Sequence, residues 1–341
     1  MLNQKYRVLV ITDHLTHGKG ESIYPLLRQM SHNPLCQSIK VASRGNSKNK
    51  DFFEGNKFSE IHTINVDENF KYDIEGKLFL ENTSPSKADE FDVLFLRLDR
   101  PVSDDFLNFI TNHFSEKNII NTPSGIKVTG SKDFLLNFQE ICPPLKLCHT
   151  IQDVIKFSRQ FPIVLKPLRN YGGKGIVKVV DDFVWDNNTR FSFAEYKPVL
   201  TKYFRNTGDY LAMKYLKNVN KGDKRVIVVN GEIMGATLRL PQKGSWICNL
   251  SVGGSSSFAE PDEQEIKIAN TITPRLIEKG VVIYGFDTLV DDNNRRVLSE
   301  INTLNVGGLL QAEMHSGQPV IQKSSDLIWE YISKNINQSN V

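Results

Sequence analysis

Three glycines within four positions, Gly172, Gly173 and Gly175, mark the first segment whose residue types could do chemistry. Glycine lets backbone N–H groups approach an anion closely, and the nearby Lys166 and Lys174 add positive charge. The segment is neither a Walker phosphate-binding loop nor a dinucleotide fingerprint, because both open a helix and the residues that follow here read as a strand. It therefore predicts either a hairpin tip that folds over phosphates as a flap, or a tight turn with solvated lysines.

Two carboxylates and an amide near the C-terminus, Asp287, Glu300 and Asn302, form the second such set. Strand alternation puts Glu300 and Asn302 on one face, and a hairpin with its turn midway would put Asp287 opposite Glu300. Oxygen ligands of this kind suit Mg²⁺, which takes one or two carboxylates and completes its shell with water and phosphate. The alternative is an exposed charged strand face, against which the interleaved apolar residues argue.

The composition excludes several classes of protein. Of 341 residues, 42 are Lys or Arg and 39 are Asp or Glu, and the net charge of +3 is too small to indicate nucleic-acid binding. The 20 Phe and 10 Tyr exclude a disordered chain. No apolar run reaches the ~20 residues that a membrane span needs. The four cysteines form no C-x-x-C pair, and the first residues lack an apolar signal core. We therefore expect a cytoplasmic protein with reduced thiols, no membrane contact and no nucleic-acid partner.

The elements that must position these residues follow from hydrophobic periodicity. The first part of the chain alternates buried strands with amphipathic helices, as an open α/β sheet does. Its strands are expected at 6–12, 38–42 and 93–98, its helices at 21–31 and 104–114, with short strands and turns over 59–81.

The rest of the chain is dominated by strand patterns. Asn230-Gly231 between two alternating runs is the strongest hairpin signal. A helix at 262–279 is expected to kink or split at Pro274, and 241–258 is expected to be a Gly/Ser-rich loop. The other expected helices lie at 131–138, 151–159 and 323–334, and the strands at 162–166, 176–180, 196–201, 209–216, 225–230, 233–240, 281–289 and 296–302.

Turn-rich residues 121–125 suggest a domain boundary. We predict an α/β protein, α+β in its C-terminal part, with three domains. An N-terminal open α/β domain covers 1–122, a small domain with the Gly-rich loop covers 123–213, and a C-terminal domain around an antiparallel sheet covers 214–341.

A series of short motifs supports a more specific interpretation. In chain order they are Lys166-Pro167-Leu168, Gly172-Gly173-Lys174-Gly175-Ile176, Tyr215-Leu216, Gly222-Asp223-Lys224-Arg225-Val226, Val228-Val229-Asn230-Gly231-Glu232, Arg239-Leu240-Pro241, Asn249-Leu250, Gly253-Gly254, Gly285-Phe286-Asp287 and Glu300-Ile301-Asn302. In this order and spacing, over about residues 120–305, the chain resembles the ATP-grasp superfamily, and within it the prokaryotic glutathione synthetases. The N-terminal third is similar only in its α/β character.

The resemblance implies a role for each matching position. The implied ATP-binding residues are Lys132 and Lys166 at the phosphates, Gly172, Gly173 and Gly175 in the flap, Lys214, Tyr215 and Leu216 in the adenine hinge, Asp223 near the ribose, and Asn302. The implied ligands of Mg²⁺, or of Mn²⁺ in its place, are Asp287, Glu300 and Asn302. The implied catalytic residues are Arg239, facing the γ-phosphate and the activated carboxylate, and Arg225, orienting substrate or phosphate. The plainer alternatives are strand-face arginines, a helix-surface Lys132 and a Tyr215-Leu216 core pair.

The activity that the resemblance implies is that of an ATP-dependent carboxylate–amine ligase of glutathione biosynthesis. Such an enzyme joins γ-glutamylcysteine to glycine through an acyl phosphate and releases ADP and phosphate, and the resemblance also suggests a homo-oligomer. Two alternatives stay open: the same chemistry with another acid or amine, and a non-catalytic nucleotide-binding regulator.

Two departures from the family pattern bear on these alternatives. Thr303 to Gly308 replaces a Val-Thr-Ser-Pro-Thr type run that lies near substrate in the family, so the substrate is in question. The turn at 291–295 is longer than in the bacterial enzymes and is expected to be a solvent hairpin that leaves the metal site intact. The loop from His14 to Glu21 follows the first strand, where α/β folds often bind ligands, although an ordinary loop is the simpler interpretation.

Overall fold

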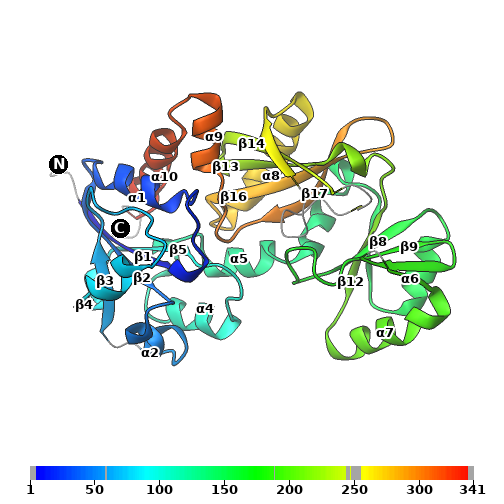
Figure 1. Ribbon diagram of the computed structural model, residues 1–341, viewed down its shortest axis with the longest axis horizontal. Coiled ribbons are helices and arrows are strands. Elements are labelled where there is room, and N and C mark those ends of the chain that lie inside the picture. The colour runs from blue at the N-terminus through cyan, green and yellow to red at the C-terminus, as the bar shows by residue number, and fades with distance from the viewer. Residues whose placement is uncertain (1–4, 58–59, 188, 243–245, 247–254, 337–341) are drawn as a thin grey trace.

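The computed structural model describes residues 5–57, 60–187, 189–242, 246 and 255–336, which fold around three β-sheets (Figure 1). The N-terminal sheet and the central sheet lie at opposite ends of the long axis, and the C-terminal sheet lies between them. No helix of the described residues is both long and apolar enough to cross a membrane.

The N-terminal sheet has six strands in the order β4-β3-β2-β1-β5-β6. Their bounds are Tyr6–Thr12 for β1, Cys36–Ser43 for β2, Ile61–Asn65 for β3, Ser84–Ser86 for β4, Val93–Arg97 for β5 and Ile119–Ile120 for β6. Strand β1 pairs in parallel with β2 on one side and β5 on the other, so the strand order reverses at β1. The apolar run that predicted β1 is explained by burial on both faces of the sheet.

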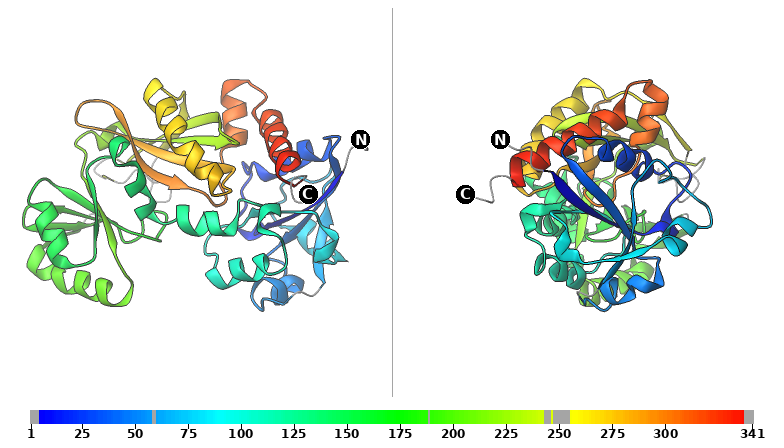
Figure 2. Two further views of the ribbon diagram at one scale, coloured as in Figure 1. Left: turned by 180° about the vertical axis from the view of Figure 1, so that it is seen from behind. Right: turned by 90° about the vertical axis from the view of Figure 1, so that its left-hand side faces the viewer.

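Helices cover both faces of this sheet. Helix α1 (Ile23–Ser31) and the last helix, α10 (Val320–Ile336), pack together on one face, where the indole of Trp329 donates to the carbonyl of Met30 at 3.1 Å (Figure 2). Helix α4 (Asp104–Thr111) packs on the other face. The C-terminal end of the chain therefore helps to complete the core of the N-terminal sheet.

The central sheet is antiparallel, in the order β11-β10-β9-β8-β12-β7. Its strands are β7 (Leu145–Cys148), β8 (Ile163–Pro167), β9 (Val177–Val180), β10 (Phe183–Asp186), β11 (Thr189–Ser192) and β12 (Tyr210–Lys214). Helices α6 (Ile151–Ser158) and α7 (Phe193–Asn206) share its core. The predicted strand at 196–201 is wrong, because it lies inside α7. Ser192 and Glu195 form a capping box at the start of this helix, and Tyr196 and Leu200, one turn apart, are its buried residues.

The C-terminal sheet is antiparallel, in the order β15-β14-β13-β16-β17. Its strands are β13 (Asp223–Val229), β14 (Glu232–Leu240), β15 (Ser255–Ala259), β16 (Ile283–Val290) and β17 (Arg296–Asn302). Asn230 and Gly231 turn between β13 and β14 with positive φ angles of 46° and 88°, as the hairpin signal predicted. Helix α8 (Glu263–Glu278) runs through Pro274 as one helix, so the split is wrong, and the kink that was its alternative stays a prediction.

Several other expectations need correction. Strand β15 occupies the end of the predicted loop 241–258, of which 243–245 and 247–254 lie outside the described residues. The turn-rich stretch at 121–125 opens helix α5 (Pro123–Thr129), capped by the hydroxyl of Thr122. A 3-10 helical segment, Lys132–Ile141, replaces the helix expected at 131–138.

The remaining elements are short. They are α2 (Lys50–Phe53), α3 (Lys77–Glu81), α9 (Leu309–Ser316) and 3-10 turns at His14–Thr16, Ser47–Asn49, Ala88–Glu90, Glu116–Asn118 and Val219–Lys221. The sequence did not predict α3 or α9. The domain boundaries at 122/123 and 213/214 stay predictions.

Candidate active site

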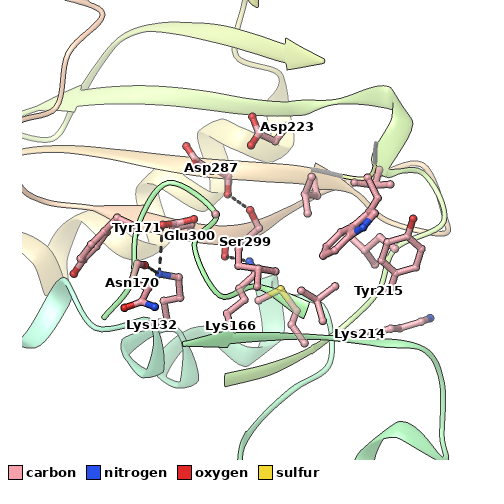
Figure 3. A pocket seen from close by; sticks show the side chains of 18 residues that line it. Lys132, Lys166, Asn170, Tyr171, Lys214, Tyr215, Asp223, Asp287, Ser299 and Glu300 are labelled. Atoms are coloured by element: carbon pink, nitrogen blue, oxygen red, sulfur yellow. Dashed lines mark hydrogen bonds and ion pairs between the residues drawn. The ribbon is translucent and has the colours of Figure 1, made fainter. Parts of the chain in front are cut away.

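Two adjoining cavities collect most of the predicted site residues, the first between the central and C-terminal sheets and the second between the C-terminal sheet and the loops that follow β1 and β5. Predicted residues that line the first cavity are Lys132, Lys166, Gly173, Lys214, Tyr215, Leu216, Asp223, Asp287 and Glu300 (Figure 3). Predicted residues that line the second, of about 530 Å³, are Gly172, Arg225, Arg239, Glu300 and Asn302. Glu300 belongs to both, so the two cavities share a wall.

Two buried lysines project into the first cavity. Lys166, on β8, donates from Nζ to the carbonyl of Ser299 at 3.0 Å, which links the central sheet to β17. Lys132 donates to the carbonyl of Asn170, and its Nζ lies 3.8 Å from Oε1 of Glu300. Burial lowers the pKa of Lys132, although the Glu300 charge opposes this. Cations desolvated in this way interact strongly with a phosphate that displaces their carbonyl partners.

The Gly-rich segment forms the turn between β8 and β9 and lies over both cavities. Gly172, Gly173 and Gly175 have φ angles of 66°, 78° and 73°, a conformation that side chains other than glycine rarely adopt. The turn is anchored by Tyr171, whose hydroxyl donates to the carbonyl of Gly130 at 2.8 Å. The geometry fits both sequence interpretations, since the segment is a tight turn and lies where a flap would cover a ligand.

The far end of the first cavity has an apolar and aromatic wall. Met213, Leu216, Trp246 and Leu289 line it together with Tyr215, which lies beside Trp246 at a ring-centroid distance of 6.3 Å. A slot of this kind suits a planar aromatic base. The buried lysines, Lys132 and Lys166, lie farther along the same cavity.

The hinge segment contacts the turn at 291–295. Lys214 Nζ lies 2.8 Å from a carboxylate oxygen of Asp292, and the backbone N–H of Lys217 donates to the same side chain at 3.1 Å. Asn218 donates to the carbonyl of Asp291. Residues 292–295 are exposed, so the turn is the solvent hairpin that the sequence predicted, and it also supports the residues that line the cavity.

Asp287 lies at the centre of a buried ion cluster. Arg225 donates from Nε and Nη2 to its two oxygens, both at 2.8 Å, and Nη2 of Arg239 lies 2.7 Å from Oδ2. Arg239 also donates from Nε and Nη2 to Asp223, at 2.6 and 2.8 Å. Strand register brings these residues together, since Arg225 lies opposite Asp287 on β16 and Asp223 lies opposite Arg239 on β14. Neither arginine is an ordinary solvated strand-face residue.

The cluster shifts the pKa values of its two carboxyl groups in opposite directions. Burial alone would raise the pKa of Asp287, but Arg225 and Arg239 hold it well below its usual range. Burial, and then repulsion from Asp287, raise the pKa of Asp223. We therefore expect Asp287 to be negatively charged at neutral pH.

The oxygen atoms needed for a divalent cation lie on β16 and β17. Asp287 is directly opposite Glu300, as predicted, and the amide of Asn302 lies 3.5 Å from Oδ2 of Asp287. Among the described residues, no group of three or more His, Cys, Asp or Glu side chains could hold a metal alone. Two carboxylates and an amide fit Mg²⁺ only if phosphate and water supply the remaining ligands, which is its usual manner of binding beside a nucleotide.

Several residues that line the cavities were not predicted. They are Val164, Asn170, Tyr171, Ile176, Met213, Val219, Trp246, Leu289 and Ser299 in the first, and Thr16, Asp99, Arg100, Tyr171 and Leu304 in the second. Thr16 belongs to the loop after β1, for which the sequence allowed either ligand binding or an ordinary loop, and Asp99 and Arg100 follow β5. The motif residues Asn249-Leu250 and Gly253-Gly254 lie outside the described residues.

Comparison with known proteins gives a consistent picture. Residues 131–317 match the family described as "Prokaryotic glutathione synthetase, ATP-grasp domain". The chain is 30% identical over 250 residues to the glutathione synthetase of Brucella melitensis, which covers 71% of this chain and 73% of that one. It is 27% identical over 252 residues to that of Prochlorococcus marinus, covering 71% and 76%.

Among solved structures, the D-alanine–D-alanine ligase of Coxiella burnetii superposes with a TM-score of 0.62 at 13% identity, covering 99% of this chain and 97% of that one. At this identity the likeness concerns the fold alone. It confirms the predicted fold, with an N-terminal mixed α/β sheet followed by the two antiparallel sheets of the ATP-grasp arrangement.

Proposed function

The chain belongs to the prokaryotic glutathione synthetase family of ATP-grasp ligases, and from this premise we propose that it joins γ-glutamylcysteine to glycine. One observation carries the proposal. Two buried lysines, an arginine–aspartate cluster and a three-oxygen metal set converge from different sheets on two cavities that share Glu300. This is the equipment for phosphoryl transfer to a carboxylate, where cation placement does most of the catalysis.

The reaction has two steps in this proposal. The cysteinyl carboxylate attacks the γ-phosphorus of ATP, the bond from that phosphorus to the bridging oxygen breaks, and ADP leaves. The amine of glycine then attacks the acyl carbon of the acyl phosphate, loses a proton, and inorganic phosphate leaves as the amide bond forms. Exclusion of water protects the acyl phosphate, which is the role we assign to the Gly-rich flap.

The residues divide the work by position. Lys132 and Lys166 hold the phosphates, and Lys214, Tyr215 and Leu216 form the wall against the adenine. Arg239 and Arg225 are the catalytic residues, since they line the second cavity and can orient the attacking carboxylate toward the phosphate. Asp223 holds Arg239 in place at 2.6 Å, so its closeness to the ribose stays a prediction.

Asp287, Glu300 and Asn302 would hold Mg²⁺, with Mn²⁺ as the substitute. When bound, the cation supplies positive charge against the negative charge that develops on the transferred phosphoryl group. The presence of all three side chains on one face of the β16–β17 pair argues against a non-catalytic nucleotide-binding regulator.

The second candidate is a ligase of the same chemistry with another acid or amine. It is favoured by Thr303 to Gly308, because Leu304 of this run lines the second cavity. The test is phosphate release from Mg-ATP with γ-glutamylcysteine plus glycine, compared with omission of each. Release that needs both, with glutathione identified by mass, supports the proposal. Release that needs other acids or amines would favour the second candidate, and no acid-dependent release at all would refute both.

A further inference from the structure

The wall of the second cavity contributed by the N-terminal sheet carries two charged side chains that the reaction steps above do not use. Asp99 and Arg100 follow β5, and Thr16 follows β1. The order of the strands reverses between these two, and open α/β sheets bind ligands at the carboxyl ends of the strands at such a point. The arginine cluster and Asn302 line the same cavity from the C-terminal sheet.

Asp99 is a half-buried carboxylate without an ion-pair partner, although the buried Arg97 guanidinium interacts with it electrostatically from farther away. Its Oδ1 accepts a hydrogen bond of 2.6 Å from the amide of Asn305, and no Lys, Arg or His nitrogen of the described residues lies within 4 Å of it. Its second oxygen has no hydrogen-bond donor among the side chains and backbone that the structure describes. Taking a carboxylate partly out of water without a partner is costly, so a cationic ligand would bind here favourably.

Arg100 is a cation that likewise has no ion-pair partner. Its guanidinium stacks on the ring of Tyr171, 3.5 Å from the ring centroid, and no carboxylate oxygen in the described parts of the chain lies within 4 Å. Tyr171 belongs to the Gly-rich turn, so the cation is held between the N-terminal domain and the flap. Its planar group can receive a carboxylate in two parallel hydrogen bonds.

A carboxylate and a guanidinium lie side by side on one cavity wall, neither of them in an ion pair within 4 Å among the described residues, and together they match a zwitterion. We propose that Asp99 and Arg100 form a subsite for the α-amino-acid head group of the acid substrate, with Asp99 receiving the ammonium and Arg100 the carboxylate. This rests on the proposed function, since γ-glutamylcysteine carries such a head group at the end opposite its reacting carboxylate. The head group would bind on the N-terminal wall while the reacting end faces Arg239.

Asn305 is the positioning residue of this subsite. It belongs to the run that departs from the family pattern, has a left-handed φ of 45°, and places its amide on Asp99. The carbonyl of Val306 beside it accepts a hydrogen bond of 3.0 Å from Arg97, so the segment is fixed to the end of β5. The change of sequence in this run therefore has a physical role, because Asn305 orients the Asp99 carboxylate that would bind the ammonium group.

The test crosses three variants with three acids. The acids are γ-glutamylcysteine, its deamino analogue glutaryl-cysteine, and its decarboxy analogue 4-aminobutyryl-cysteine, each assayed for kcat/KM with saturating Mg-ATP and glycine. Wild-type protein should lose about 10- to 100-fold with each analogue, the worth of one charge-assisted hydrogen bond. Asp99→Asn should lose that factor with γ-glutamylcysteine but change little with the deamino analogue. Arg100→Gln should do the same toward the decarboxy analogue, and Asn305→Ala should follow Asp99→Asn in milder form.

Matched controls come from the neighbouring cavity beyond Arg100, which Asp104 and Lys127 line. Asp104→Asn and Lys127→Gln change the same charges outside the subsite and should leave all three ratios as in wild type. Titration with ATP establishes that each variant is folded and binds nucleotide. An equal loss with all three acids in both subsite variants, or no loss in either, would overturn the inference.

The wild-type arm separates the two proposals. If wild type makes no glutathione, the proposed function fails, and phosphate release is then measured with a panel of acids. Release that requires an ammonium and a carboxylate on one carbon, and that Asp99→Asn abolishes, would still support the subsite. Equal use of acids without that head group would overturn it.

Discussion

Replacing Arg239 with methionine removes the cation that two buried carboxylates share. The arginine side chain is 9% exposed, and those of Asp223 and Asp287 are 13% and 5% exposed. In the variant, Asp287 keeps Arg225, but Asp223 has no other Lys, Arg or His nitrogen within 4 Å among the described residues. Breaking a buried ion pair from one side typically costs about 3–5 kcal/mol of the free energy of unfolding.

Protonation of Asp223 limits this cost and gives it a pH dependence. Burial and the Asp287 charge already raise the pKa of Asp223, and loss of Arg239 raises it further. Neutralising a carboxyl with an unfolded-state pKa of about 3.9 costs about 5 kcal/mol at pH 7.5 and about 2 kcal/mol at pH 5.5. The wild-type pKa of Asp223 is already raised to about 6, so between pH 6 and the still higher pKa of the variant only the variant holds the proton, and its stability relative to wild type falls as pH rises through that window.

The assay is urea unfolding of nucleotide-free protein at pH 5.5 and 7.5. We expect Arg239→Met to lose about 3–5 kcal/mol at the higher pH and about 2 kcal/mol at the lower. A second substitution, Asp223→Asn, should restore most of the loss. Arg295→Met is the matched control, because this arginine is 64% exposed in its pair with Asp291 and such pairs contribute about 0–1 kcal/mol. A loss within 1 kcal/mol of the control, or no rescue by Asp223→Asn, would refute the buried cluster.

Three further outcomes are expected. Glu300→Gln should lower kcat/KM at least about 100-fold and raise the Mg²⁺ concentration needed for half-maximal rate, with an unchanged urea midpoint; a normal rate would remove Glu300 from the metal set. Asp292→Ala removes the 2.8 Å partner of Lys214 and should raise the KM for ATP about 3- to 10-fold with kcat within twofold. An unchanged KM would show that the turn at 291–295 does not support the ATP site. Burial lowers the pKa of His17 to about 4, so wild-type stability should fall as pH drops through the window from about 6.5 to 4, by about 3 kcal/mol in total. Chemical unfolding across that range should show a flatter dependence for His17→Gln, and an equal slope would contradict the assignment.

The sequence predicted those parts of the fold where one periodicity dominates. The strands β1, β13 and β14 lie where an apolar run or apolar–polar alternation predicted them. Asp287 lies opposite Glu300 because the hairpin turn is midway between them, as predicted. It misassigned α7 because aromatic and β-branched residues favour strands, while the capping box and the one-turn spacing of buried residues determine the helix.

The ion cluster shows why side-chain partners are harder to predict than strands. The hairpin turn alone would place Asp223 opposite Leu238, with Arg239 on the other face of the sheet. A bulge between Ile227 and Val228 shifts the register by one residue and brings Arg239 opposite Asp223. A one-residue shift reverses the face of every side chain beyond it, and no local pattern here announced the bulge.

The electrostatic balance of the two cavities indicates why the site needs three sheets. The fixed charges near the proposed phosphate position are four cations, Lys132, Lys166, Arg225 and Arg239, against three anions, Asp223, Asp287 and Glu300. A Mg²⁺–nucleotide complex and a reacting carboxylate both add negative charge. The excess of one positive charge on the protein neutralises only part of that added charge. A zwitterionic head group adds none, so its recognition can be moved to the N-terminal wall without disturbing the phosphate end. Separating the two tasks on different sheets lets the head group fix the position of the acid while the lysines and arginines respond to the charge that moves during the reaction.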